Sequence, residues 1–335
     1  MKVIELNGPS LEALRRAERP EPTAARGQVL LRLRAAALNY LDVAVATGAF
    51  PVPQFPLIPV ADGAGEVVAL GEGVEDLAIG DRVVPHFMPN WQGGAITPFS
   101  IAAMRGVNLP GSLAEYVAVP ATSMLRLPGH LDFMQGATLP VAATTAWNAV
   151  RSAALRPGSV VLLLGTGGVS LFALQFAKAS GATVILASSS DEKLERARRL
   201  GADHLINYRA APAWDEEVLR LTGGRGADLV VETVGHATWA RSLNAAATGG
   251  TLFTVGFVTG TGVSIDLLPI IVKGLRIVGN NTGSVADLAE ALRAIEAHRI
   301  VPVVDRVFDI HEVDGAYAEL AAGGRHFGKI AIALP

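Results

Sequence analysis

The sequence predicts an α/β fold in which a doubly wound parallel sheet is inserted into a β-rich domain. Three observations support this prediction. An apolar run at 159–164 leads into a glycine-rich turn, which is typical of a buried parallel strand followed by a helix. From Val160 to about Asn280, strand-like and helix-like segments alternate, as in a parallel sheet with helices on both faces. The two ends of the chain lack this alternation.

The first 120 residues contain short strand-like segments separated by turns that are rich in Gly and Pro. These segments are 29–34, 65–69, 81–84 and 114–119. This pattern is typical of a β-rich, partly open barrel.

The turn at Gly165–Gly168 predicts a dinucleotide-binding site. The strand before it and a helix over 171–180 would present backbone N–H groups and a helix N-terminus to a pyrophosphate. Gly181 follows this helix, where a glycine commonly ends one. The alternative is a tight turn without a ligand, but the flanking strand and helix favour the nucleotide site.

The alternating region accounts for the rest of the predicted sheet. Its strands are expected at 160–164, 183–187, 204–206, 228–231, 251–255 and 275–279, and two of its helices at 191–200 and 238–247. Ligands of such sheets bind beyond the carboxyl ends of the strands.

After Asn281 the pattern predicts an amphipathic helix and two closing strands. Ser284 with Asp287 forms a plausible N-cap pair for the helix, and the strands are expected at 301–307 and 329–333. The predicted organisation is therefore a β-rich domain over 1–122 and 281–335, with the nucleotide-binding domain over 123–280 between its two parts.

Composition excludes several classes of function. The chain has 335 residues, a formal net charge of −3 and no cysteine, so disulfides, cysteine nucleophiles and cysteine-ligated zinc are excluded. The charge gives no reason to expect nucleic acid or a membrane as partner. The first residues lack the apolar segment of a signal peptide, and no apolar run is long enough for a membrane span. A cytoplasmic protein is expected.

A set of motifs in matching order resembles the medium-chain dehydrogenase/reductase family. In order along the chain, these motifs are 39–42 (NYLD), 62–67 (DGAGEV), 80–83 (GDRV), 137–140 (ATLP), 144–147 (TTAW), the glycine turn, 200–208 (LGADHLINY) and 328–330 (GKI). The resemblance covers nearly the whole chain and is to the branch of quinone oxidoreductases and zinc-independent alcohol-dehydrogenase-like enzymes. It implies a GroES-like catalytic domain built from both chain ends and a central Rossmann domain, with the active site between them.

The resemblance also implies that no catalytic zinc is bound. The positions of the cysteine, histidine and cysteine that hold zinc in zinc-dependent members correspond to Asn39, Ala61 and Val141, and Asp62 replaces the glutamate that follows the histidine. None of the three is an ordinary zinc ligand. The chain also lacks the four-cysteine structural zinc lobe, so we expect no metal.

The region after the second strand of the nucleotide domain favours NADPH over NADH. A carboxylate about 20 residues beyond the first glycine of the turn normally accepts the ribose hydroxyls of NAD. This chain instead has Ser188, Ser189 and Ser190, with Lys193 close behind. Serine hydroxyls, a helix N-terminus and a cation suit a 2′-phosphate. By resemblance Lys193 and Tyr208 flank that phosphate; the alternative is that Ser190 only caps a helix and Lys193 is solvated.

Other site residues follow from the resemblance. Asn39 and Tyr40 are candidates for orienting the substrate and stabilising an oxyanion, and Asp42 either holds their loop or caps a helix that begins near Leu41. Ser170 replaces the third glycine of the nucleotide motif. The expected cofactor contacts are Thr145, Gly165, Thr166, Gly167, Gly168, Val169, Ser188, Ser189, Ser190, Lys193, Tyr208, Gly256, Phe257, Asn280 and Lys329.

A hydrophobic substrate pocket is expected as well. Its candidate lining residues, each of which could instead belong to the core, are Phe50, His86, Phe87, Trp91, Phe257 and Val258. Related enoyl reductases have a tyrosine proton donor where this chain has Phe50, so solvent or Tyr40 would supply the proton.

The sequence thus predicts an NADPH-dependent, zinc-independent oxidoreductase that transfers hydride to a quinone or an α,β-unsaturated carbonyl. One alternative is an NADP-dependent alcohol or carbonyl dehydrogenase, and another is an NADPH-binding protein with weak activity. The expected substrate is a small hydrophobic carbonyl or quinone. A homodimer is expected through the edge strand near 275–279.

Overall fold

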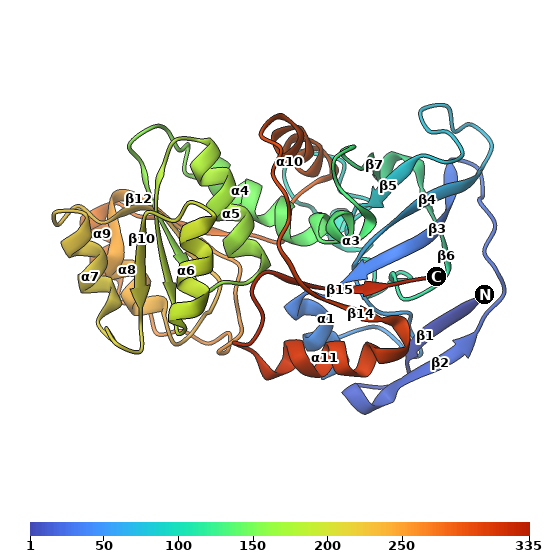
Figure 1. The fold of residues 1–335 in the computed structure, drawn as a ribbon, viewed down its shortest axis with the longest axis horizontal. Helices are drawn as coiled ribbons and strands as arrows, with labels where there is room; N and C mark the ends of the chain where they lie inside the picture. The colour runs from blue at the N-terminus through green and yellow to red at the C-terminus, as the bar shows by residue number, and fades with distance from the viewer. The chain divides into compact units, whose positions relative to one another are not determined.

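A computed structural model describes all residues 1–335, which form two compact units (Figure 1). Unit 1 comprises Met1–Thr144 and Gly283–Pro335, and unit 2 comprises Thr145–Thr282. The units divide at 144/145 rather than near 122 because helix α3 (Phe133–Ala137) packs on the unit 1 strands β3 and β4, where Gly136 lies against Leu127 and Ala64. No helix combines the length and the apolar character that crossing a membrane requires.

Unit 1 is built on a mainly antiparallel sheet whose middle strands are long and apolar. Its strands run in the order β14 (Val304–Asp309), β15 (Lys329–Ala333), β3 (Gln28–Ala37), β4 (Asp62–Leu70), β5 (Arg82–Pro85) and β7 (Met124–Arg126), and β6 (Tyr116–Pro120) also pairs with β3. The predicted strands of both chain ends are therefore confirmed. The sequence analysis missed a separate hairpin of β1 (Lys2–Leu6) and β2 (Leu14–Glu18).

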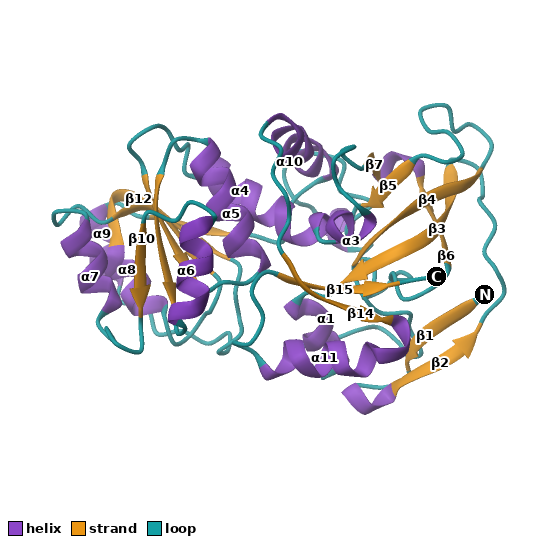
Figure 2. Ribbon diagram, viewed as in Figure 1, coloured by secondary structure: helices purple, strands orange, loops and turns teal.

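The two ends of the chain meet in the centre of this sheet. Strand β15 pairs antiparallel with β3, which places Ala331 opposite Ala37, and β3 pairs antiparallel with β4, which places Ala37 opposite Asp62. These pairings bring three segments together at the same end of the central strands, namely the end of β3, the start of β4 and the start of β15. Figure 2 shows β15 and β3 coming together there.

Short helices complete unit 1. They are α1 (Tyr40–Ala46), α2 (Pro98–Ile101), α3, a π-helical turn η3 (Leu139–Ala143), α10 (Val285–Ala297) and α11 (Val313–Ala322), with 3-10 turns η1 (Leu11–Ala13), η2 (Ala121–Ser123) and η4 (Ile310–Glu312). The predicted N-cap of α10 is confirmed, since the Ser284 hydroxyl accepts from Asp287 N at 3.1 Å and the Asp287 carboxylate accepts from Ser284 N at 2.8 Å.

Unit 2 is the predicted parallel sheet with helices on both faces (Figure 1). Its strands run in the order β10 (His204–Asn207), β9 (Thr183–Ser188), β8 (Val160–Leu164), β11 (Ala227–Glu232), β12 (Ala246–Thr254) and β13 (Arg276–Gly279). Its helices are α4 (Thr144–Ser152, which begins at the last residue of unit 1), α5 (Gly168–Ala179), α6 (Asp191–Arg199), α7 (Trp214–Leu221), α8 (Trp239–Ala245) and α9 (Leu267–Lys273). The order of the strands reverses between β8 and β11, which makes the edge beyond β8 a switch point.

One predicted helix of unit 2 is too long. The helix expected over 238–247 ends at Ala245, and β12 begins at Ala246, which pairs with Ala227 of β11. Alanine has the highest helix propensity of the common residues, but propensity is a small energy that pairing with a buried parallel strand overrides.

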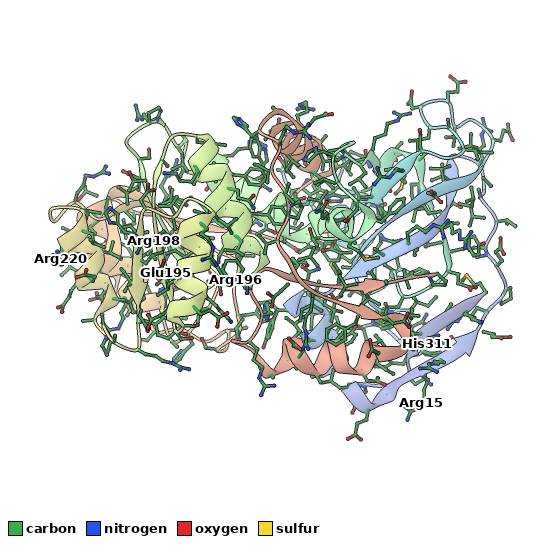
Figure 3. All side chains as sticks on the ribbon, viewed as in Figure 1. Arg15, Glu195, Arg196, Arg198, Arg220 and His311 are labelled. Carbon is green, nitrogen blue, oxygen red and sulfur yellow. The ribbon has the colours of Figure 1, made fainter.

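Surface charges line the outer helices of unit 2. Figure 3 shows Glu195, Arg196 and Arg198 on α6, where Leu194 and Ala197 face the core. The ion pair between Glu195 and Arg198 spans 3.3 Å and is exposed at both ends. Exposed pairs of this kind contribute at most about 1 kcal/mol, so the buried face of α6 is what holds the helix on the sheet.

Candidate active site

The turn between β8 and α5 has the form that a pyrophosphate requires. Gly165 adopts φ +75° and donates its N–H to Ala187 O at 2.7 Å, and Gly167 is the N-cap of the twelve-residue helix α5. A Cβ built on Gly165 or Gly167 would meet nothing within 4 Å. The surface of the turn is therefore open at both glycines, so that a phosphate could approach the backbone closely. Thr166, Gly168 and Val169 complete the turn and the first residues of α5.

Ser170, the departure from the glycine motif, has a structural role. Its buried hydroxyl donates to Leu164 O at 2.8 Å and so links α5 to the end of β8. A glycine would allow the same close packing but could not form this hydrogen bond.

The residues predicted to bind a 2′-phosphate gather where β9 and β10 end. Ser188 is the buried last residue of β9, and Tyr208 N donates to Ser188 O at 3.1 Å. Ser190 caps α6 by accepting from Lys193 N at 3.4 Å, as one alternative predicted. The half-buried Ser189 lies between them, and the side chain of Tyr208 is exposed.

The remaining predicted cofactor residues, apart from Lys329, lie in unit 2. Thr145 is buried in α4, and the Asn280 amide donates to Thr282 O at 3.0 Å. Gly256 is packed so tightly that a Cβ would come within 1.8 Å of the Thr233 backbone, so only glycine fits there. Phe257 follows it and is half-buried.

In unit 1, Asp42 holds the start of α1. Its carboxylate accepts from Asn39 N at 2.7 Å and from Ala61 N at 3.0 Å. The first bond closes the N-terminus of the helix, and the second ties the loop before β4 to it. Both roles that the sequence left open for Asp42 are therefore present. Tyr40, the first residue of α1, is half-buried.

Asp62 and Lys329 form a buried network with the Asn39 side chain. The Asn39 amide donates to Asp62 Oδ2 at 2.8 Å, and Lys329 Nζ donates to Asn39 Oδ1 at 2.6 Å and approaches Asp62 Oδ2 at 3.4 Å. Asp62 Oδ1 accepts from the backbone N–H of Val141 at 3.0 Å. That N–H lies in the first turn of η3.

Burial perturbs the ionisable groups of this network. Loss of hydration raises the pKa of Asp42 to about 7 and raises the pKa of Asp62, while hydrogen bonds and Lys329 oppose both shifts. Burial lowers the pKa of Lys329, and the neighbouring carboxylates oppose that change. Perturbed groups gathered in this way are typical of functional sites.

The sequence analysis missed two further members of this region, Arg105 and Tyr317. The Arg105 side chain is fully buried and donates to Gly111 O at 3.2 Å and Ser112 Oγ at 3.1 Å. Burial lowers the pKa of Arg105 to about 10, and the charge of Asp62 opposes that shift. The buried Tyr317 hydroxyl has no hydrogen-bond partner, and burial, together with the charge of Asp42, raises its pKa well above the usual value. No local motif marks either residue, because each reaches the region through tertiary packing.

The candidate substrate-lining residues divide between surface and core. His86 is fully buried, its Nδ1 lies 3.0 Å from Met88 N, and burial lowers its pKa to about 4. Phe87 and Trp91 belong to the core of unit 1, the alternative left open above, and the half-buried Phe50 packs against that core. Phe257 and Val258 lie in unit 2, where Val258 is exposed.

The residues at the zinc positions do not fit a zinc ion. Ala61 and Val141 have no side-chain donor atom, and both polar atoms of the Asn39 amide are engaged with Asp62 and Lys329. An ammonium group bonded to Asn39 would also lie beside any cation placed there. These residues therefore provide no set of ligands for a zinc ion.

Comparisons with known proteins agree with this architecture. Residues 25–129 match the model of the alcohol dehydrogenase GroES-like domain, and residues 168–297 match that of zinc-binding dehydrogenases. A zinc-type alcohol dehydrogenase-like protein of Schizosaccharomyces pombe is 41% identical over 316 residues, which cover 92% of this chain and 91% of the relative. The chain belongs to the medium-chain dehydrogenase/reductase superfamily.

Two further relatives of this medium-chain dehydrogenase/reductase illustrate its range. A quinone oxidoreductase of Pseudomonas aeruginosa is 33% identical over 308 residues, which cover 88% of both chains. A crystal structure of an NAD-dependent alcohol dehydrogenase has a TM-score of 0.90 and 33% identity, and the match covers 100% of both chains. The superfamily consists of oxidoreductases that bind a nicotinamide cofactor, and this chain is an oxidoreductase of that type.

Proposed function

We propose that this protein is an NADPH-dependent, zinc-independent reductase of α,β-unsaturated carbonyls or quinones. The observation that carries the proposal is that Asn39, at one of the positions where zinc-dependent relatives have a metal ligand, is bound in a network with Asp62 and Lys329 instead. An alcohol dehydrogenase polarises its substrate oxygen with zinc. A reductase of an activated double bond needs only hydrogen-bond donors for the oxygen that becomes negative.

The proposed reaction divides the work between cofactor and protein. NADPH, when bound, would supply the hydride for the β-carbon of an enone, and the electron pair of the C=C bond would then move toward the carbonyl oxygen. Asn39 donates a hydrogen bond to that oxygen, and the half-buried Tyr40 lies next to Asn39 in the same segment. A proton from Tyr40 or solvent at the α-carbon completes the reduction.

The preference for NADPH is supported by the end of β9. The residue there is Ser188, and α6 begins three residues later, at Asp191, with Ser190 as its cap. Asp191, the first acidic residue of α6, accepts from the Asn207 amide at 2.7 Å, and this bond engages its carboxylate. Ser188, Ser189, Ser190, Lys193 and Tyr208 would then bind the 2′-phosphate.

Steady-state kinetics test this proposal. Purified protein should oxidise NADPH when a short enone or a quinone is added, and it should do so faster than with NADH at equal concentration. Metal analysis of the same sample should find well under one zinc per chain. Alcohol oxidation that disappears with a chelator and returns with zinc would instead identify an alcohol dehydrogenase. Cofactor binding without turnover on enones, quinones, aldehydes or alcohols would identify a weakly active NADPH-binding protein.

We further propose that the protein is a homodimer, paired through β13. This strand is the edge of the unit 2 sheet, and its side chains are largely exposed. The adjoining helix α9 exposes apolar side chains, namely Leu267, Leu268, Ile271 and Val272, each at least 63% exposed. Edges and apolar patches of this kind mark association surfaces. Light scattering should report twice the chain mass, and a monomer at micromolar concentration would contradict the proposal.

A further inference from the structure

Four buried charged side chains lie in unit 1 in the region of Asn39. Two carboxylates, Asp42 and Asp62, and two cations, Arg105 and Lys329, are each at most 4% exposed. Burying a charge is costly unless it is paired, so such a group of residues persists where its arrangement serves a purpose. Asn39 is hydrogen-bonded to both carboxylates and to Lys329, and it is only half-buried itself.

The network determines which way the Asn39 amide points. An ammonium group can only donate, so the atom that faces Lys329 Nζ at 2.6 Å is the amide oxygen. A carboxylate can only accept, so the atom that faces Asp62 Oδ2 at 2.8 Å is the amide nitrogen. The two restraints agree, and neither partner would tolerate a flipped amide.

This orientation leaves one N–H of Asn39 available. The amide nitrogen carries two hydrogens, and the bond to Asp62 uses one of them. The donation from Lys329 to the amide oxygen polarises the group and strengthens its N–H as a donor, because hydrogen bonds in a chain reinforce one another in a medium of low dielectric constant. Lys329 itself, at 4% exposure, lies behind Asn39 rather than at the surface.

Backbone packing also fixes the position of Asp62, the carboxylate partner of Asn39. Val60, two residues before Asp62, adopts φ +74°, a conformation that a β-branched residue rarely occupies. Its carbonyl accepts from Ser112 N at 2.7 Å, and a Cβ on Gly106 would come within 2.8 Å of Ala61 N. The segment that delivers Asp62 to the network is therefore confined by its neighbours.

We propose that Lys329 is a positioning residue for reduction: it holds and polarises the Asn39 amide, whose free N–H then binds the substrate oxygen. This inference rests on the function proposed above and adds a role to a residue that the sequence assigned to cofactor binding. The two roles make different predictions. Loss of a cofactor contact weakens NADPH binding, whereas loss of the positioning cation slows the reaction of the bound complex.

The test compares Lys329→Met with Lys329→Arg. Lys329→Met should lower kcat about tenfold or more, while the KM for NADPH changes by less than about threefold. Lys329→Arg keeps a cationic donor for the Asn39 oxygen and should recover much of kcat. The matched control is Lys273→Met, because Lys273 is also partly buried and donates to Leu243 O, Asn244 O and Ala246 O in unit 2. Its kcat should stay at the wild-type value.

A second measurement reads the orientation directly. The side-chain amide of Asn39 should give a distinct, slowly exchanging NH₂ resonance pair in wild-type protein and lose that signature in Lys329→Met. If Lys329→Met does not fold, the double variant Lys329→Met/Asp62→Asn removes both buried charges and should still show the lower kcat and the altered resonance.

The outcomes separate the two proposals. An unchanged kcat with a raised KM for NADPH in Lys329→Met, or an unchanged Asn39 resonance, would overturn the positioning role and return Lys329 to cofactor binding. If wild-type protein reduces neither enones nor quinones, the proposed function fails, and the resonance measurement still decides whether Lys329 orients Asn39.

Discussion

Two strand-to-helix junctions of this protein have contrasting chemistry. At the end of β8, the chain turns into α5 through glycines whose backbone is open to a ligand. At the end of β3, it turns into α1 through Asn39, whose side chain enters a buried network with Asp62 and Lys329. The first junction would bind through N–H groups that every residue has, and the second depends on side chains from three distant segments.

The two junctions differ in how far a binding site there can be predicted from the sequence. A backbone site needs glycines at set spacing and a strand and helix on either side, all within about a dozen residues. The side-chain network depends on Asp62 and Lys329, which lie 23 and 290 positions away from Asn39 in the sequence, and no local pattern predicts that they meet it. The following predictions test this contrast.

The largest effect is expected from removing one charge of the β3 junction. Asp62→Leu leaves the Lys329 ammonium buried without its carboxylate and should lower the free energy of unfolding by about 3–5 kcal/mol. Urea unfolding measures this loss. The double variant Asp62→Leu/Lys329→Met should regain a good part of it, because it removes both desolvated charges. Equal losses in the single and double variants would show that the pair is not coupled.

The β3 junction should also respond to pH. Burial raises the pKa of Asp42 to about 7 from an ordinary value of 3.8, so the folded state binds the proton more tightly than the unfolded state. The contribution of Asp42 to stability is therefore lost as pH rises from about 4 to about 7, by at most about 1.4 kcal/mol per pH unit.

Comparison with Asp42→Asn isolates this effect. The pKa of His86 is lowered to about 4, which makes stability rise over part of the same range, but that contribution is common to both proteins. The difference in unfolding free energy between wild type and Asp42→Asn should fall by about 3 kcal/mol between pH 4 and pH 7.5. A difference that does not vary with pH would show that Asp42 titrates normally.

At Ser188, which ends the strand next to β8, the expected effect is on the preference between NADPH and NADH. Ser188→Asp would place a carboxylate where we propose that the 2′-phosphate binds, and NADPH affinity should fall about a hundredfold, or about 2.7 kcal/mol. NADH binding should be spared or improved, because the carboxylate can accept from the ribose hydroxyls. Cofactor titration by fluorescence measures both. The neutral Ser188→Asn serves as control, and an unchanged preference in Ser188→Asp would remove the support for NADPH.

The smallest effect is expected inside the β8 junction. Ser170→Ala removes the hydroxyl that donates to Leu164 O, which still accepts from Thr233 Oγ1 at 2.8 Å, so stability should fall by only about 1 kcal/mol. Ser180→Ala, at the half-buried end of the same helix, should cost less. A loss of several kcal/mol in Ser170→Ala would mean that this junction, too, depends on its side chains.

Particular residues show how far sequence reasoning extends. The glycine turn, the cap of α10 by Ser284 and the strands of unit 2 follow from local patterns, and the structure has them close to where the patterns place them, except that β12 begins at Ala246 rather than at 251. The end of the helix at Ala245 could not be predicted, because pairing of Ala246 with β11 overrides helix propensity. Local context left Phe87 and Trp91 as candidates for either a substrate pocket or the core, and the structure packs both in the core of unit 1.

The sequence by itself determined the fold class, the parallel sheet and its glycine turn, since each depends on periodicity and residue type within a short window. Only the tertiary structure decided that Lys329 meets Asn39. The antiparallel register that places Ala331 opposite Ala37, continued by the bond from Leu38 N to Ile330 O, brings Lys329 to Asn39, while Asp62 begins the neighbouring strand. Register is a property of how strands pair, and buried charges acquire their partners and their shifted pKa values only once that pairing is made.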